Sequence, residues 1–255
     1  MEYKYQGIIL SKRGVGETDR IYTIYTLEMG KIRVLAKSVR LPKAKLAGFL
    51  EPITLSEIFL AKTKGLGKIT GSIVNNNFSQ IKSNLVSMQK VFRVFKILEK
   101  VVTDQERDEK IFNLLKDYLE TMDSLSSIDN SKNENKKNIV TLGFLFNFLG
   151  ESGYQIEVGK CVKCDQKLQS QNNYFNAYLG GFLCEGCVFQ EDKKTSDLWY
   201  STRPSKADDN SIKIIRLFLR NKLANFVKID ASERDVRQIE IIFSDFLSWI
   251  FGKTN

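Results

Sequence analysis

Four cysteines within a 27-residue window give the clearest chemical signal in this 255-residue sequence. Two C-x-x-C pairs are separated by nineteen residues. A two-residue spacing lets both thiolates of a short turn point at one tetrahedral ion. The pattern therefore predicts one structural Zn²⁺ per chain, held by Cys161, Cys164, Cys184 and Cys187. Four thiolates fill the coordination shell and leave no position for water or substrate, which argues against catalytic zinc.

Two other uses of paired cysteines remain open as weaker alternatives. A redox C-x-x-C pair is one, although the chain lacks a thioredoxin-like βαβ pattern around either pair. An iron–sulfur cluster is the other, because it is also held by four thiolates. The neighbouring Lys160, Lys163 and Lys167 either contact DNA or offset the negative charge of a tetrathiolate complex, and the second role is favoured.

The sequence contains few of the residue combinations that form catalytic sites. The chain contains no histidine, which excludes Ser-His-Asp triads, Cys-His dyads and His-ligated metals. No P-loop or dinucleotide fingerprint occurs, since Gly14-Val15-Gly16 lacks a third glycine and a following helix. Glu17 and Asp19 form only a weak carboxylate pair for a nuclease. We therefore expect that the protein is not an enzyme.

Basic residues are concentrated in the first third of the chain. The whole chain has 39 Lys plus Arg and 30 Asp plus Glu, a net charge of +9, and residues 1–80 hold 13 of the bases and six of the acids. No acid occurs between Glu28 and Glu51, whereas six bases do. Packed like charges repel unless an anion lies nearby, so a phosphate-binding stripe is favoured over a solvated surface charged by chance.

The elements that position these residues change type near residue 80. Strand-forming runs occur at residues 5–10, 20–27, 32–36, 49–60 and 68–74. Along 32–36, the apolar side chains alternate with Arg33, Leu35 and Lys37, so one face points to a core and the other carries cations. Five short strands in eighty residues, with glycine turns near Gly30 and at 65–67, predict a small barrel, which protects its strand edges by closing.

Helical periodicity follows the strands. Apolar residues recur at three- and four-residue steps over 88–102, 111–119, 139–149, 212–223 and 236–250. Residues 139–149 are apolar on most sides, which predicts a central helix, and the polar stretch 124–138 predicts a loop. The aromatic residues between the cysteine pairs predict a short hairpin with its turn at Gly180-Gly181. The fold class is therefore α+β, with a barrel domain at 1–80 and a helical domain at 81–255 into which a zinc module at 159–190 is inserted.

No targeting signal and no run of 18 or more apolar residues occurs. We therefore expect a soluble, cytoplasmic protein without a membrane partner. Four cysteines in a reducing compartment are expected to be metal ligands or buried thiols rather than disulfides.

A family resemblance rests on several short motifs. They lie at residues 7–13, 16–19, 25–26, 30–32, 50–52, 65–67 and 180–184. Together with the four cysteines they make the chain resemble the RecO family of bacterial DNA repair proteins over nearly its whole length. One departure is Asp165, where the family often has Gly after the first cysteine pair; it puts the turn of that pair in doubt but leaves the ligands intact.

The resemblance implies a recombination mediator of the RecFOR pathway that acts after DNA damage. Such proteins bind single- and double-stranded DNA through an N-terminal OB-fold and anneal complementary strands. With RecR they help to load RecA onto strands coated by the single-strand binding protein (SSB), whose acidic C-terminal tail they contact. A nucleoid-associated cytoplasmic location is implied as well.

OB barrels bind strands in a groove that combines cations for phosphates with aromatic rings for bases. The candidate phosphate contacts are Lys12, Arg13, Arg20, Arg33, Lys37, Arg40, Lys43 and Lys45. Tyr22, Tyr25 and Phe49 are candidate stacking residues, although aromatic residues of a small barrel more often belong to its core. Two clusters of cations beside apolar residues, at 90–96 and 213–220, are alternative sites for the acidic tail.

Other classes of protein share parts of this pattern. A zinc-ribbon transcription or translation factor also combines cations, zinc and a barrel, and it is the principal alternative. A nuclease and a purely structural assembly protein are the others. Annealing of bare complementary strands without nucleotide would favour a mediator over the transcription or translation factor. Nuclease activity that disappears in Glu17→Ala would indicate a nuclease, and absent DNA binding at low salt would indicate a structural protein.

Overall fold

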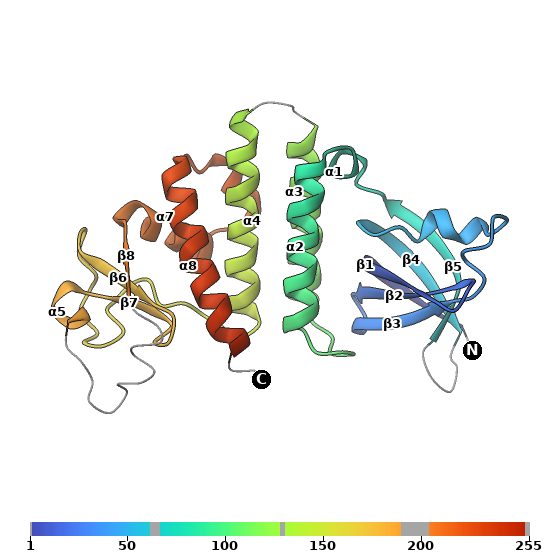
Figure 1. Cartoon of the computed structure of the whole chain (residues 1–255), viewed down its shortest axis with the longest axis horizontal. Helices are drawn as coiled ribbons and strands as arrows, with labels where there is room; N and C mark the ends of the chain where they lie inside the picture. The colour runs from blue at the N-terminus through green and yellow to red at the C-terminus, as the bar shows by residue number, and fades with distance from the viewer. Residues whose placement is uncertain (1, 62–66, 128–130, 190–203, 253–255) are drawn as a thin grey trace. The chain divides into compact units, whose positions relative to one another are not determined.

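The computed structural model describes residues 2–61, 67–127, 131–189 and 204–252 (Figure 1). The chain divides into two compact units, Met1–Asp129 and Asn130–Asn255. The barrel ends close to the expected boundary at residue 80, but the first unit continues through two long helices. Within the described residues, no helix is long and apolar enough to cross a membrane.

Five strands of the first unit form a closed barrel, in which neighbours follow the order β1-β2-β3-β5-β4 and β4 pairs again with β1. The strands are β1 (Glu2–Val15), β2 (Asp19–Thr26), β3 (Gly30–Ala36), β4 (Thr54–Ala61) and β5 (Gly67–Asn76). All pairs are antiparallel except β3 with β5, which is parallel. Five strands in a Greek-key barrel are the architecture of an OB-fold, which confirms the predicted class.

Strand alternation produces the barrel core. Ile32 and Val34 of β3 are buried, whereas Arg33 between them is exposed, as the sequence predicted. Before β4, the structure differs from the prediction: residues 45–49 form the short 3₁₀ helix η1 (Lys45–Phe49) and the strand starts only at Thr54. Of the predicted turn at 65–67, Gly67 opens β5 and the other two residues lie outside the described residues.

Three helices complete the first unit: α1 (Ser79–Ser83), α2 (Leu85–Val101) and α3 (Glu109–Ser126). Side chains cap the two long ones, since Asn84 accepts from the Ser87 N–H and Asp108 accepts from the N–H groups of Lys110 and Ile111. Helix α3 packs on the barrel where Phe112 stacks on Tyr25, with ring centroids 6.4 Å apart.

The second unit is built around α4 (Ser131–Glu151), which packs against α7 (Asp209–Arg220), the 3₁₀ helix η2 (Leu223–Lys228) and α8 (Glu233–Gly252). Phe146 of α4 lies against both Phe218 and Phe243. The predicted central helix is thus confirmed. The predicted loop at 124–138 is wrong at both ends: residues 124–126 belong to the last turn of α3, and residues 131–138 form the first turns of α4.

A small sheet lies between α4 and α7 in the sequence. Its strands β6 (Asn173–Asn176) and β7 (Gly181–Leu183) form the predicted hairpin, with Gly180 at φ 68° in the turn. A third strand, β8 (Ser205–Ala207), pairs with β6. The short helix α5 (Glu185–Val188) follows the hairpin and carries the last cysteine.

Candidate metal centre and nucleic-acid interface

The fold brings all four cysteine sulfurs together. Every pair of Sγ atoms among Cys161, Cys164, Cys184 and Cys187 lies within 4.8 Å, and those of Cys164 and Cys184 are 3.8 Å apart. A tetrahedral ion with Zn–S bonds of about 2.3 Å requires sulfurs about 3.8 Å apart. The donor set therefore fits a tetrahedral thiophilic ion. Among the described residues, this is the one group of three or more potential ligands.

The first cysteine pair lies in a tight turn. The Asp165 N–H donates to the Cys161 carbonyl at 2.9 Å, and the Cys161 N–H donates to the Gln166 carbonyl at 2.8 Å. Asp165 has φ 60°, in the left-handed region that favours glycine and that aspartate adopts more readily than most residues. The departure noted in the sequence thus leaves the turn intact, because Asp165 takes the conformation that a glycine would provide.

The second pair opens a helix. Cys184 precedes the first residue of α5, and its carbonyl accepts from the Cys187 N–H at 3.1 Å. Its own N–H points at the Cys161 sulfur, at 3.4 Å. Burial opposes ionisation of Cys161, but this N–H and those of Cys164 and Lys163 outweigh it and lower the pKa of that thiol to about 6. One sulfur of the cluster is therefore prepared to be a thiolate.

The metal module is anchored to the helices of its own unit. Phe175 of β6 meets Phe246 of α8 edge to face, with centroids 6.3 Å apart. The Arg216 Nε donates to the Val158 carbonyl at 2.7 Å, just before the first cysteine pair. Lys160, one of three lysines predicted to offset the thiolate charge, is paired with Asp165. These contacts make the module a fixed part of the unit.

Candidate phosphate contacts gather where the β1–β2 turn meets the segment after β3. The Arg40 N–H donates to the Thr18 carbonyl at 2.9 Å, and its guanidinium Nη1 donates to the Gly16 carbonyl at 3.2 Å. Arg20 pairs with Ala36 in the β2–β3 ladder, directly before Lys37. Arg20, Lys37 and Arg40 therefore converge at one end of the barrel.

An aspartate organises this cluster. The Ser38 N–H donates to Asp19 at 2.7 Å and, together with Thr18 and the nearby cations Lys37 and Lys68, lowers the pKa of Asp19. Lys68 was not among the predicted contacts. It joins the cluster because β5 pairs with β3 at Leu35, a parallel pairing that no local sequence signal announces.

Two of the predicted contacts lie elsewhere. Lys12 is paired with Glu51, and the Arg33 guanidinium lies 3.9 Å from Asp104. Lys31, which belongs to the basic stripe of the sequence, is buried: its ammonium pairs with Asp104 at 3.0 Å. The cations of the basic stripe therefore have two different positions. Those at the start of β3 pair with Asp104, and those after the end of β3 are exposed.

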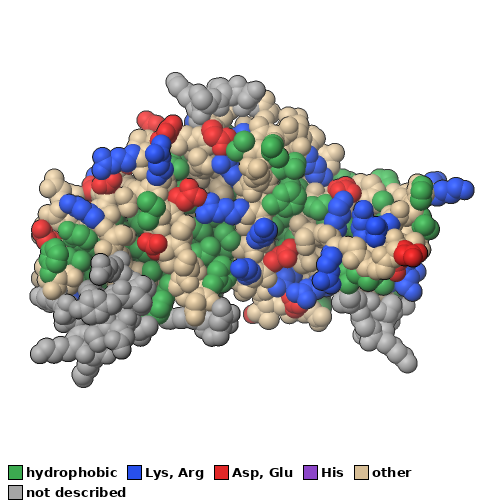
Figure 2. Space-filling model, viewed as in Figure 1, with side chains coloured by type: hydrophobic (Ala, Val, Ile, Leu, Met, Phe, Trp, Pro, Cys, Tyr) green, Lys and Arg blue, Asp and Glu red, His purple; other side chains and the backbone are tan. Residues whose placement is uncertain are grey.

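The remaining predicted contacts are exposed: Arg13 on β1, Lys43 in the turn before η1, and Lys45 at the start of η1. Figure 2 shows Lys and Arg side chains spread over the viewed side of the barrel region. We define the barrel-end cluster as Arg13, Arg20, Lys37, Arg40, Lys43, Lys45 and Lys68. Of the candidate stacking residues, Tyr22 and Tyr25 are buried in the core and Phe49 is half exposed.

Two protein-family models together match nearly the whole chain. Residues 1–78 match the family model described as recombination protein O N terminal, and residues 92–254 match recombination protein O C terminal. The chain belongs to the recombination protein O family. The proteins named DNA repair protein RecO from Dehalococcoides mccartyi strain 195 and from Desulforamulus reducens are 29% and 23% identical to it. The alignments cover 99% and 98% of this chain and 92% and 90% of the relatives.

Membership of the recombination protein O family confirms the resemblance found in the sequence. The N-terminal family match ends at residue 78, two residues after β5, so it coincides with the barrel. The C-terminal match spans both the helices and the four cysteines. Glu17 and Asp19, the weak carboxylate pair noted in the sequence, do not act together in the structure. Asp19 accepts a hydrogen bond from the Ser38 N–H, whereas Glu17 is exposed.

Proposed function

We propose that this protein is a DNA repair and recombination mediator that binds DNA through the barrel-end cluster and anneals complementary strands. The observation that carries the proposal is the convergence of cations on the β1–β2 turn. In OB-folds the β2–β3 face and the β1–β2 and β4–β5 loops bind oligonucleotides. Family membership favours this role over the transcription or translation factor that the sequence left open.

The proposed mode of binding suits annealing. Cations that follow phosphates bind strands without reading base edges, which stay free to pair with a second strand. Both single- and double-stranded DNA present phosphates, so both are proposed ligands. No catalytic residue is assigned, since annealing lowers the repulsion between strands without making or breaking a covalent bond.

The metal is proposed to be Zn²⁺ in a structural role. Cys161, Cys164, Cys184 and Cys187 would hold it, and the ion would fix two turns that otherwise share only a small hairpin. The ion would cross-link the two turns and would supply no reaction chemistry.

Partners are proposed from the family. With RecR, the protein would help to load RecA onto SSB-coated single strands in the cytoplasm, at the nucleoid. For the acidic SSB tail we favour α2, where Phe92 is partly exposed beside the exposed Arg93 and Lys96. On α7, the alternative site, Arg216 donates to the Val158 carbonyl and Lys213 pairs with Asp209 at 2.6 Å.

The salt dependence of DNA binding tests the proposed site. A variant with Lys37, Arg40, Lys43 and Lys45 all replaced by Ala should bind single strands more weakly. Its slope of log K against log salt should be smaller by up to about 3, because each lost phosphate contact removes about 0.7.

A control variant of equal charge removes four exposed lysines of the second unit: Lys136, Lys206, Lys222 and Lys228. We expect its salt slope to stay at the wild-type value. If the control and the barrel variant changed the slope equally, DNA would be responding to net charge and the barrel-end site would be rejected.

A further inference from the structure

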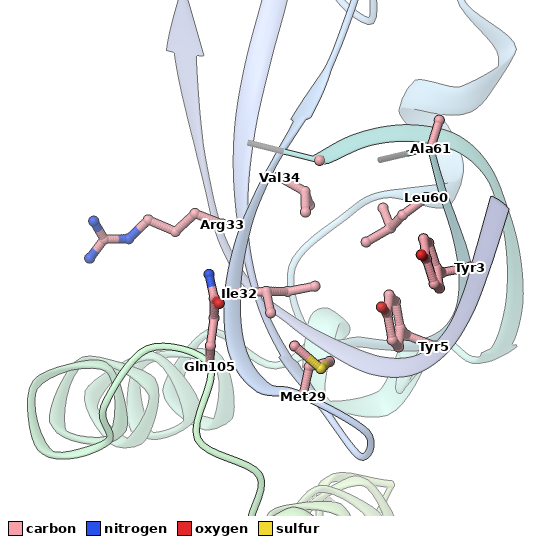
Figure 3. Close-up of a pocket in the computed structure, with 10 residues that line it drawn as sticks. Tyr3, Tyr5, Met29, Ile32, Arg33, Val34, Leu60, Ala61 and Gln105 are labelled. Atoms are coloured by element: carbon pink, nitrogen blue, oxygen red, sulfur yellow. The ribbon is translucent and has the colours of Figure 1, made fainter. Parts of the chain in front are cut away.

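The mouth of the barrel contains an open cavity that the cation cluster does not explain. It measures about 430 Å³ and is lined from β1, β3 and β4, with Gln105 of the α2–α3 connection at its rim (Figure 3). Ile32, Val34 and Leu60 form its apolar wall, and each is less than a tenth exposed. This volume lies within the range of small-molecule sites.

Four of the five barrel strands contribute residues to this cavity or to its edge. Strands β3 and β5 pair at only two positions, Val34 with Gly67 and Leu35 with Lys68. Gly67 of β5 lines the cavity beside Val34, its partner in the ladder.

Two tyrosine rings stand side by side in the opening. Tyr3 and Tyr5 are alternate residues of β1, so they face the same side of the strand, and their rings are 6.3 Å apart and nearly parallel at 8°. Figure 3 shows both rings pointing into the cavity. Burial raises the pKa of Tyr5, with Tyr3 and Glu28 adding to the effect.

The chemistry of the lining selects a flat, neutral group with polar edges. Among the described residues that line the cavity there is no carboxylate, and the polar side chains are the two phenols, the Gln105 amide and Arg33. Arg33 points away from the cavity in Figure 3, and its side chain is 57% exposed. An aromatic group inserted between apolar walls, with an anion outside at Arg33, would match these features.

We propose that this cavity, the tyrosine mouth, holds one unstacked nucleobase of a bound single strand. The proposal rests on the proposed DNA-binding function and extends it. Arg33 and Leu35 share the outer face of β3, and Lys37 directly follows its end, about 13 Å along the chain from Arg33, so one strand can pass from the barrel-end cluster to the mouth. Bases of a duplex are stacked and paired, and they cannot enter without being extruded.

Oligonucleotides with and without bases test this directly. Fluorescence anisotropy would compare a labelled 12-residue oligothymidine with an oligonucleotide of equal length that carries abasic sites at its centre. We expect the wild type to bind the abasic strand about tenfold more weakly, since one base–aromatic stack is worth about that factor.

The tyrosine variant Tyr3→Leu/Tyr5→Leu should bind both oligonucleotides equally. Leucine keeps the site apolar and removes the rings. The control Tyr154→Leu changes an exposed tyrosine of the second unit and should keep the tenfold preference. A tyrosine variant that kept the preference would overturn the proposal, as would a wild type that bound both strands equally.

The wild type alone gives a second readout if the tyrosine variant does not fold. An oligonucleotide with 5-iodouracil should crosslink to Tyr3 or Tyr5, as mapped by mass spectrometry, and crosslinks confined to other residues such as Phe49 would overturn the proposal. A wild type that bound neither oligonucleotide would instead refute the DNA-binding function, so the two failures are distinct.

Discussion

Asp165 closes the turn of the first cysteine pair with a backbone conformation that most side chains resist. Its φ of 60° lies in the left-handed region, and its N–H holds the Cys161 carbonyl. Aspartate tolerates this region because its short polar side chain can bond locally, and here it pairs with Lys160. The geometry of the cysteine site thus depends on a residue that is not itself a ligand.

Substitution of Asp165 should separate backbone strain from side-chain contacts. We expect Asp165→Val to lower the free energy of unfolding by about 1–2 kcal/mol, because a β-branched residue is strained at this φ. Asp165→Gly should stay within about 0.5 kcal/mol of wild type, since glycine adopts the region freely. Chemical denaturation measures both. Equal losses in the two variants would assign the effect to the Lys160 pair.

The four cysteines are expected to hold a metal ion in the purified protein. Protein purified without added metal should contain about one Zn²⁺ per chain by elemental analysis. Cys161→Ser should lose the ion and unfold at a lower temperature, because binding free energy of a structural ion is folding free energy. Lys163→Ala, next to the ligands, should retain the metal. A wild-type protein that folds without metal would contradict the structural role.

Among the secondary-structure elements, β3 of the barrel packs closely against the α2–α3 connection, and Gly30 is the residue that allows this close approach. Gly30 opens β3 at φ 64°, and a Cβ there would lie 1.8 Å from the carbonyl oxygen of Glu106. Beside it, the Lys31 ammonium donates to the Glu99 carbonyl at 2.7 Å, and the Gln105 N–H donates to the Lys31 carbonyl. The start of β3 is therefore fixed to the last turn of α2 and to the α2–α3 connection.

Replacement of Gly30 by Ala should break this junction. We expect a loss of about 2 kcal/mol or more in the free energy of unfolding, from both the left-handed φ and the clash with Glu106. Gly150→Ala is the matched control: it lies in α4 with no atom near the added Cβ, so helix propensity should leave it neutral or more stable. A Gly30→Ala variant as stable as the control would show that the connection moves easily.

The elements also show where sequence reasoning reaches its limit. Periodicity predicted the strands and most helices, because an alternating or 3.6-residue pattern directly encodes which face is buried. It failed at 131–138, where polar residues suggested a loop; Asn133 and Lys137 are buried there, so tertiary packing overrides weak propensity. The third strand of the metal module, β8, was also missed, since three residues carry no periodicity.

At the scale of the whole molecule, the metal ligands were predictable and the DNA surface was predictable only in part. Cysteine spacing identifies ligands because two short turns fix the sulfurs locally. A charged surface depends on pairing between strands that are distant in the sequence, so Lys68 lies in the barrel-end cluster whereas Lys31 of the basic stripe is buried. Two acids outside the basic stripe form ion pairs with predicted or neighbouring cations: Glu51 pairs with Lys12, and Asp104 pairs with Lys31.

In the proposed function, DNA lies on the barrel-end cluster so that complementary strands can anneal. The most direct measurement is the rate at which complementary oligonucleotides anneal without nucleotide, with and without single-strand binding protein. We predict that the wild type accelerates annealing, that the variant lacking Lys37, Arg40, Lys43 and Lys45 falls to near the uncatalysed rate, and that the second-unit control stays active. Annealing by the barrel variant at the wild-type rate would contradict the account.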